Sequence, residues 1–257
     1  MNQTLGTLFL VPNTLGNQDR EEQLSFVLPN DTLSQTASLQ HWIVEDAKTA
    51  RAFLKAIDSV KPLACSIQEM QMSEWRGVER HAKYSEILKP LDLLKPLLAG
   101  KDMGLMSEAG VPGVADPGAE IVRAAHQLGA RVKPLIGPSS ILLGLMASGL
   151  NGQRFAFQGY LPHDTNERSS KLKQLETESR KLQQTQLWIE TPYRNIAMLM
   201  ACFNSLAPQT QLCVGVDLSL PSEMITTVSV QEWRKRYPHE AACTFLQNRP
   251  AIFLMLA

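Results

Sequence analysis

The chain has 257 residues, in which 25 Lys and Arg balance 25 Asp and Glu, and 44% of the residues are hydrophobic. This length is enough for one large domain or two small ones with a sizeable core. The zero net charge excludes a general attraction to nucleic acid or to an acidic membrane, so RNA binding would need a local basic patch. The four cysteines are scattered, with no CxxC pair and no histidine at ligand spacing, which predicts reduced thiols, a cytoplasmic protein and no metal site.

The N-terminal residues lack the basic start and small-residue cleavage site of a secretion signal. The richest apolar stretch, residues 136–150, is interrupted by Gly, Pro and Ser, and it is too short to cross a membrane. We therefore expect no secretion signal and no membrane span.

The first half of the chain begins with alternating strand and helix signals. Residues 7–11 (TLFLV) predict a strand, and a loop rich in Pro and Gly follows. Residues 42–44 predict a second strand, which ends at Glu45 and Asp46. Asp46 can cap the next helix, whose apolar stripe consists of Ala50, Phe53, Leu54 and Ile57. Residues 65–83 show no regular pattern, whereas residues 84–98 predict another helix.

Residues 103–149 carry the most specific pattern. They predict a strand (103–106), a glycine-rich loop, a helix, a second strand (132–136), a tight loop and a final helix. Asp116 is placed to cap the first of these helices, with Pro117 at its first position, where a missing N–H costs nothing. Gly129 follows the first helix as its left-handed cap, and Gly149 ends the second helix.

Two successive strand–loop–helix units predict parallel strands, whose following loops gather at one edge of the sheet. Open α/β sheets bind ligands at that edge. The loops SEAGVPG and GPSS each combine small residues with a hydroxyl or a carboxylate. A tight turn alone would explain one such loop, but two in succession favour a binding site.

The second half predicts further alternating elements. The helix at residues 165–182 carries basic residues, among them Arg168 and Lys171, which form either a solvated helical face or a patch that contacts phosphate. Strands are expected at residues 187–190, 212–217, 223–229 and 251–256.

The segments SEAGVPGVADPG and PLIGPSS resemble those of the tetrapyrrole methylase superfamily, particularly the branch that methylates bacterial small-subunit ribosomal RNA on a ribose 2′-oxygen. VPNTLGN, EDAKT, FAFQGYLP and IETPYR resemble further segments of that branch. The chain departs from the branch where Glu108 replaces an Asp, where Lys48 replaces an Arg, and where Val216 replaces another Arg. A short HxxNE-like segment of the branch is absent.

The resemblance implies two α/β domains of the tetrapyrrole methylase type, with a cofactor cleft between them. Residues 1–153 would form an N-terminal domain with a parallel sheet, and residues 154–257 a C-terminal α/β domain. The implied cofactor is S-adenosylmethionine, and the implied assembly is a homodimer. By matching positions, the residues expected at the cofactor are Leu15, Glu108, Ala109, Gly110, Val111, Ser139, Ser140, Glu190 and Leu218.

The predicted function is S-adenosylmethionine-dependent methyl transfer, with the ribose 2′-oxygen of small-subunit ribosomal RNA as acceptor. A 2′-hydroxyl must lose its proton, and Glu45 and Asp46 are the candidate catalytic bases. Two alternatives stay open: methylation of a tetrapyrrole or other small molecule, and a non-catalytic module that binds S-adenosylmethionine. A basic face near the cofactor would favour RNA, and a deep apolar trough would favour a planar small molecule.

Overall fold

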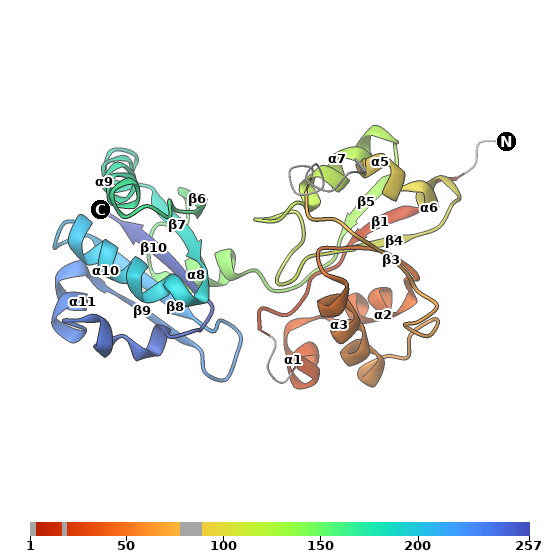
Figure 1. Cartoon of the computed structure of the whole chain (residues 1–257), viewed down its shortest axis with the longest axis horizontal. Coiled ribbons are helices and arrows are strands. Elements are labelled where there is room, and N and C mark those ends of the chain that lie inside the picture. The colour runs from red at the N-terminus through yellow and green to blue at the C-terminus, as the bar shows by residue number, and fades with distance from the viewer. Residues whose placement is uncertain (1–3, 17–19, 78–88) are drawn as a thin grey trace. The chain divides into compact units, whose positions relative to one another are not determined.

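The computed structural model describes residues 4–16, 20–77 and 89–257 (Figure 1). The chain divides into two compact units, Met1–Ser139 and Ser140–Ala257. Each unit is built around one five-stranded sheet. Among the helices that the structure describes, none combines the length and the hydrophobicity needed to cross a membrane.

The sheet of the first unit is entirely parallel. Its strands are β1 (Thr7–Leu10), β2 (His41–Val44), β3 (Gln71–Glu74), β4 (Met103–Met106) and β5 (Arg131–Pro134), in the order β3-β2-β4-β1-β5. All four residues of the central strand β4 are buried, as expected for a parallel strand covered on both faces. The sheet therefore forms the middle layer of this unit.

Helices cover both faces of the first sheet (Figure 1). One face packs against α1 (Arg20–Val27), α2 (Asn30–Ser38) and α3 (Ala47–Val60). The other packs against α5 (Pro90–Leu93), α6 (Lys95–Leu98) and α7 (Gly118–Gln127). Along β2, Trp42 and Val44 enter the first of these cores and Ile43 the second. This alternation follows from the two-residue period of a strand.

Most elements that the sequence predicts for this unit are present, with ends that differ by a residue or two. The prediction of an irregular segment at residues 65–83 is wrong in part, because β3 lies within it. The long helix predicted at residues 84–98 is also wrong over its described part. Two separate short helices lie there, because Pro90 is the first residue of α5 and Pro96 is the second residue of α6, and residues 84–88 lie outside the described residues.

The sheet of the second unit is mixed. Its strands are β6 (Phe155–Tyr160), β7 (Thr185–Glu190), β8 (Gln211–Val216), β9 (Met224–Ser229) and β10 (Ala251–Leu256), in the order β6-β7-β10-β8-β9. Only β6 and β7 pair in parallel, whereas β10 runs antiparallel between β7 and β8. The segment FAFQGYLP thus supplies an edge strand of this sheet.

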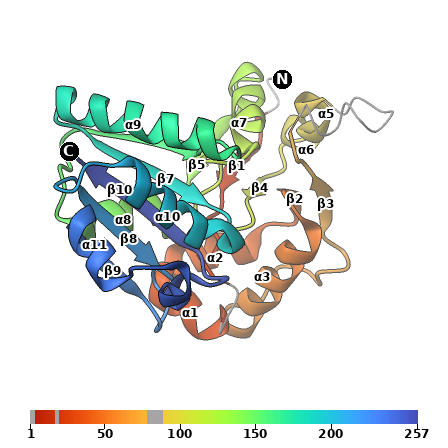
Figure 2. The same cartoon turned by 60° about the vertical axis from the view of Figure 1, so that its left-hand side comes forward.

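Helices also cover both faces of the second sheet (Figure 2). One core holds Trp188, Trp233 and Phe253 beneath α9 (Thr165–Leu182), α10 (Asn195–Ser205) and α11 (Val230–Arg236). Short 3₁₀ helices lie at η1 (Pro192–Arg194), η2 (Glu240–Ala242) and η3 (Thr244–Leu246).

Helix α8 (Ser140–Ser148) lies on the opposite face of the second sheet from α9, α10 and α11. A Cβ placed on Gly144 would lie 3.0 Å from Ile252 Cγ2, so glycine allows the helix to approach β10 closely. The second unit therefore begins at Ser140, earlier than the predicted domain boundary at residues 153 and 154, because α8 packs with the sheet that follows it.

Candidate functional site

The loops after β1 and β4 lie side by side at the carboxyl edge of the first sheet, because these two strands are neighbours. From β1 the chain continues to β2 on one side, and from β4 it continues to β5 on the other. Ligands of open α/β sheets bind outside the carboxyl ends of neighbouring strands whose connections run in opposite directions. The predicted residues Leu15 and 108–111 lie in these two loops.

Asn13 joins the two loops. Its backbone N–H donates to the Gly110 carbonyl at 2.8 Å, and its Nδ2 donates to the carbonyls of Glu108 at 2.9 Å and Ser107 at 3.3 Å. Its Oδ1 accepts from the Thr14 N–H at 2.8 Å. The Asn13 side chain is fully buried, so these contacts fix both loops without competition from water.

Two glycines allow three loops to converge. Gly110 has φ +69°, and a Cβ there would lie 3.3 Å from Leu15 Cδ2 and 3.7 Å from the Pro138 carbonyl oxygen. A Cβ on Gly137 would lie 2.3 Å from Pro12 Cγ, which leaves no room for any side chain. Ser139 then ends the first unit, and Ser140 is the first residue of α8 in the second.

The central loop exposes part of its backbone. Glu108 and Ala109 are exposed, Val111 is half-buried, and the Ser107 hydroxyl donates to the Ala109 carbonyl at 3.1 Å. A loop of small residues whose shape is fixed from behind lets a ligand approach the main chain closely. The arrangement can therefore bind a polar ligand through backbone groups.

The two candidate bases have different surroundings. Asp46 caps α3: Oδ1 accepts from the Thr49 N–H at 2.7 Å, and Oδ2 lies 3.0 Å from Arg76 Nη2. The Thr49 N–H, with a smaller contribution from Arg76, lowers the pKa of Asp46. By contrast, Glu45 Oε2 accepts from the Glu108 N–H at 3.3 Å, so this carboxylate contacts the central loop.

Asp116 stabilises the start of α7. The helix begins at Gly118, one residue later than predicted, and the Asp116 carboxylate accepts from the N–H groups of Gly118 at 2.6 Å and Gly113 at 2.8 Å. Burial raises the pKa of this carboxyl, and the N–H donors oppose that effect. A small cavity beside it is lined by Glu45, Ser107 and Asp116, among others. Asp116 therefore stabilises the start of α7, but the capping position is Pro117 and not Asp116 as predicted.

In the second unit, Glu190 and Leu218 lie at one edge of the sheet. Glu190 and Val216 both pair with Ala251, so the segments that follow β7 and β8 emerge together. Glu190 is buried; its Oε1 accepts from the Thr191 N–H at 2.8 Å, and its Oε2 lies 3.2 Å from Arg194 Nη2. Leu218 is also buried. The structure thus brings these two predicted residues together.

The prediction that Arg168 belongs to a solvated or phosphate-contacting face is wrong. Arg168 is 7% exposed, because it shares the inner face of α9 with Leu172 and Leu175. Its Nη1 donates to the His163 carbonyl at 3.4 Å, and its Nε has no partner among the described residues. Lys171 is half-buried.

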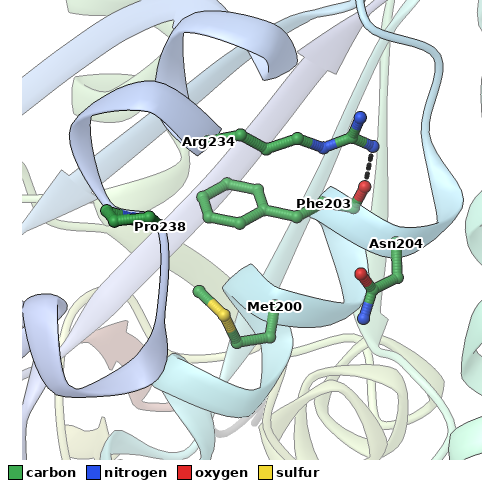
Figure 3. A pocket seen from close by; sticks show the side chains of 5 residues that line it. All are labelled: Met200, Phe203, Asn204, Arg234 and Pro238. Atoms are coloured by element: carbon green, nitrogen blue, oxygen red, sulfur yellow. Dashed lines mark hydrogen bonds between the residues drawn. The ribbon is translucent and has the colours of Figure 1, made fainter.

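A cavity of about 460 Å³ lies elsewhere in the second unit, lined by Met200, Phe203, Asn204, Arg234 and Pro238 (Figure 3). The Arg234 guanidinium donates to the carbonyls of Phe203 and Leu206 at the end of α10. This charge therefore caps a helix C-terminus, and none of the residues expected at the cofactor lines the cavity. Within the described parts of the chain, no group of three or more metal-ligating side chains occurs.

The sequence analysis did not identify two contacts at the carboxyl edge of the first sheet. Asn13 could have been suspected as a polar residue directly after a buried strand, but its partners lie about 95 residues away. Arg76 follows β3, and its Nε donates to the Glu45 carbonyl at 3.1 Å. No local pattern indicated this contact, because β3 itself was not predicted.

No family model matches the chain. A ribosomal RNA small subunit methyltransferase I from Synechocystis is 33% identical over 248 residues, which cover 96% of this chain and 76% of the relative. The protein of that name from Pseudomonas aeruginosa is 28% identical over 236 residues, which cover 88% of this chain and 71% of the relative. The one from Vibrio cholerae is 32% identical, and the chain spans only 50% of its length.

Several solved structures share the fold. The methyltransferase CobJ superposes with a TM-score of 0.57 at 13% identity, covering 97% of this chain and 93% of CobJ. Uroporphyrin-III-C-methyltransferase from Thermus thermophilus superposes with a TM-score of 0.51 at 14% identity, covering 98% of this chain and 92% of the other. These likenesses confirm the predicted two-domain α/β fold, and the relatives confirm the predicted recognition as a methyltransferase. With one third of its residues identical to a relative across both units, the chain belongs to the ribosomal RNA small subunit methyltransferase I family.

Proposed function

We propose that this chain is an S-adenosylmethionine-dependent methyltransferase that acts on a ribose 2′-oxygen of small-subunit ribosomal RNA. The observation that carries the proposal is the 33% identity to a relative of that name over 96% of the chain. The converging loops of the first unit support it, because they offer backbone groups at the usual binding edge of an α/β sheet. The tetrapyrrole methyltransferases share the fold only, so they do not favour a tetrapyrrole acceptor.

The loops of the first unit suit this cofactor. Gly110 has no side chain, and the neighbouring Glu108 and Ala109 are exposed, so a ribose and a methionine chain can approach the main chain there. We assign this part of the cofactor to Leu15, the residues 108–111, Ser139 and Ser140. Glu190 and Leu218 of the second unit are assigned to the adenine.

When bound, S-adenosylmethionine supplies a methyl group activated by a sulfonium. A ribose 2′-hydroxyl that accepted this methyl group would have to lose its proton, so a base would be needed beside it. Glu45 is the proposed base, since its carboxylate contacts the central loop. Asp46 is the weaker candidate, because its lowered pKa and its contacts with Thr49 and Arg76 commit it to capping α3.

The first test is calorimetric titration of S-adenosylmethionine into the wild-type protein, Glu108→Arg and the control Glu21→Arg. Glu21 is exposed on α1 and is not among the residues assigned to the cofactor. We expect binding to the wild type and the control, and its loss in Glu108→Arg, whose long side chain would occupy the ligand's position. Absence of binding to the wild type would refute the cofactor assignment.

The second test offers acceptors with methyl-labelled cofactor: unmethylated small ribosomal subunits, free ribosomal RNA and a tetrapyrrole. The proposal requires label in a 2′-O-methyl nucleoside. Label only in the tetrapyrrole would refute the RNA assignment, and cofactor binding without any methylated acceptor would indicate a binding module. Glu45→Gln should lower kcat by about 100-fold or more with unchanged cofactor affinity, whereas Asp46→Asn should retain most of kcat.

We extend the proposal to a homodimer in the cytoplasm. Burial raises the pKa of the thiols of Cys202, Cys213 and Cys243, which keeps them protonated and unreactive, as suits a reducing compartment. Sedimentation equilibrium measures the mass in solution, and a monomer at micromolar concentration would refute the dimer.

A further inference from the structure

Arg249 joins three segments of the second unit through one guanidinium. It lies in the turn before β10, and its Nε donates to Asp217 Oδ2 at 2.7 Å. Its Nη2 donates to the Ser222 carbonyl at 2.5 Å, and its Nη1 donates to the Phe245 carbonyl at 3.1 Å. The planar guanidinium makes these contacts from three separate nitrogens in fixed directions, whereas an ammonium donates from a single nitrogen.

The loop at residues 217–223, after β8, has a backbone shape that needs such support. Asp217 has φ +49° and Ser219 has φ +68°, in the left-handed region that non-glycine residues rarely adopt. Backbone of this kind persists only where the surrounding contacts determine it. Here the Asp217 carboxylate accepts from the Ser222 hydroxyl at 2.7 Å as well as from Arg249, so the two ends of the loop are tied together.

Further hydrogen bonds join the backbone of this turn to α10 and to the 217–223 loop. The Arg249 carbonyl accepts from Asn195 Nδ2 at 2.6 Å, at the start of α10. The Asp217 N–H donates to the Pro250 carbonyl at 3.0 Å. The segment after β7, with Glu190, and the segment after β8, with Leu218, are therefore held to the same turn.

We propose that Arg249 is a positioning residue for cofactor binding: it holds the 217–223 loop, and Leu218 within it, in the shape that receives the adenine. The proposal rests on the proposed function, which assigns Leu218 to the cofactor. Leu218 lies between Asp217, which Arg249 contacts, and Ser219, and it folds back over the sheet. A Cβ on Gly215 would lie 3.3 Å from Leu218 Cδ2, so a shift of the loop would move this side chain directly.

The test compares Arg249→Gln and Arg249→Lys with Arg236→Gln, a matched control on α11 whose partner is the exposed Glu232. Affinity for S-adenosylmethionine is measured by calorimetry, well below each variant's thermal midpoint. We expect Arg249→Gln to weaken binding at least tenfold, Arg249→Lys to recover part of the loss, and the control to match the wild type. At saturating cofactor, kcat should stay within about twofold of the wild type, since Arg249 does not contact the reacting atoms.

A double-mutant cycle with Leu218→Ala separates positioning from a general effect on stability. If Arg249 acts through the loop, the losses of affinity in Arg249→Gln and Leu218→Ala are not additive. Additive losses, or a lower thermal midpoint with unchanged affinity, would overturn the inference while leaving the proposed function intact. If Arg249→Gln does not fold, Asp217→Asn replaces it in the cycle. Failure of the wild type to bind the cofactor would overturn the proposed function and this inference together.

Discussion

The buried side chain of Asn13 allows a quantitative prediction for the junction of the two loops. Asn13→Ala removes two donated hydrogen bonds, at 2.9 and 3.3 Å, and two accepted from Thr14, at 2.8 and 3.5 Å, while the backbone bond to Gly110 stays. A typical hydrogen bond contributes about 1 kcal/mol, and a buried group left unsatisfied costs about 1–3 kcal/mol. Because the longer bonds contribute little, we expect the free energy of unfolding of the first unit to fall by about 2–4 kcal/mol.

The assay must report on the first unit alone, because two units need not unfold together. Hydrogen exchange in increasing urea, read by mass spectrometry on peptides from residues 103–113, measures the local free energy of opening. The exchange midpoint should fall by about 1–2 M urea with an unchanged slope. Asn30→Ala, which removes an exposed side chain on α2, is the control and should change stability by less than about 0.5 kcal/mol. A loss below about 1 kcal/mol for Asn13→Ala would refute the view that Asn13 fixes both loops.

Two further predictions concern stability. Asp46→Ala should lower the free energy of unfolding by about 1 kcal/mol at neutral pH, because the cap of α3 is lost. Since the pKa of Asp46 is lowered in the folded state, this loss should be complete above the ordinary pKa of 3.8 and should vanish as the pH falls through the lowered pKa. Urea unfolding at several pH values measures it. A cost independent of pH would contradict this. Gly137→Ala should destabilise the first unit by about 1–3 kcal/mol, since its Cβ would overlap Pro12. Gly152→Ala, with no atom within 4 Å of its Cβ, is the control, and equal effects of the two would contradict the packing argument.

β1, β2 and β4 of the first unit were predictable because they are largely buried runs bounded by Gly, Pro or a capping residue. β4 is the clearest case, with four buried residues before a glycine-rich loop. β3 was missed because its sequence, QMSE, belongs to a largely exposed edge strand and carries no apolar alternation. A strand of this kind is defined by its pairing with β2, and a local pattern does not contain that information.

The domain boundary could not be read from local pattern either. α8 is apolar around its whole circumference, so its sequence does not indicate which sheet it covers. The close approach of Gly144 to Ile252 decides this, across more than 100 residues of chain.

The same limit applies to the site. The loops that hold Leu15, Gly110 and Ser139 were recognisable from their motifs, whereas the contacts of Asn13 and Arg249 depend on partners far away in sequence. Asp46 could be assigned to capping from its position before an apolar stripe. Its second contact, with Arg76, depends on a residue that follows the unpredicted strand β3.

The central place of β10 bears on how the second unit is made. β10 is the last strand in the chain, yet it lies between β7 and β8 and supplies the pairing partner of both. During synthesis the first sheet can assemble once β5 has emerged, because all of its strands precede residue 135. The second sheet must wait for residues 251–256, and until then β7 and β8 expose unpaired backbone that other chains could pair with. A nascent chain halted before residue 251 would therefore carry one complete sheet and one open to aggregation.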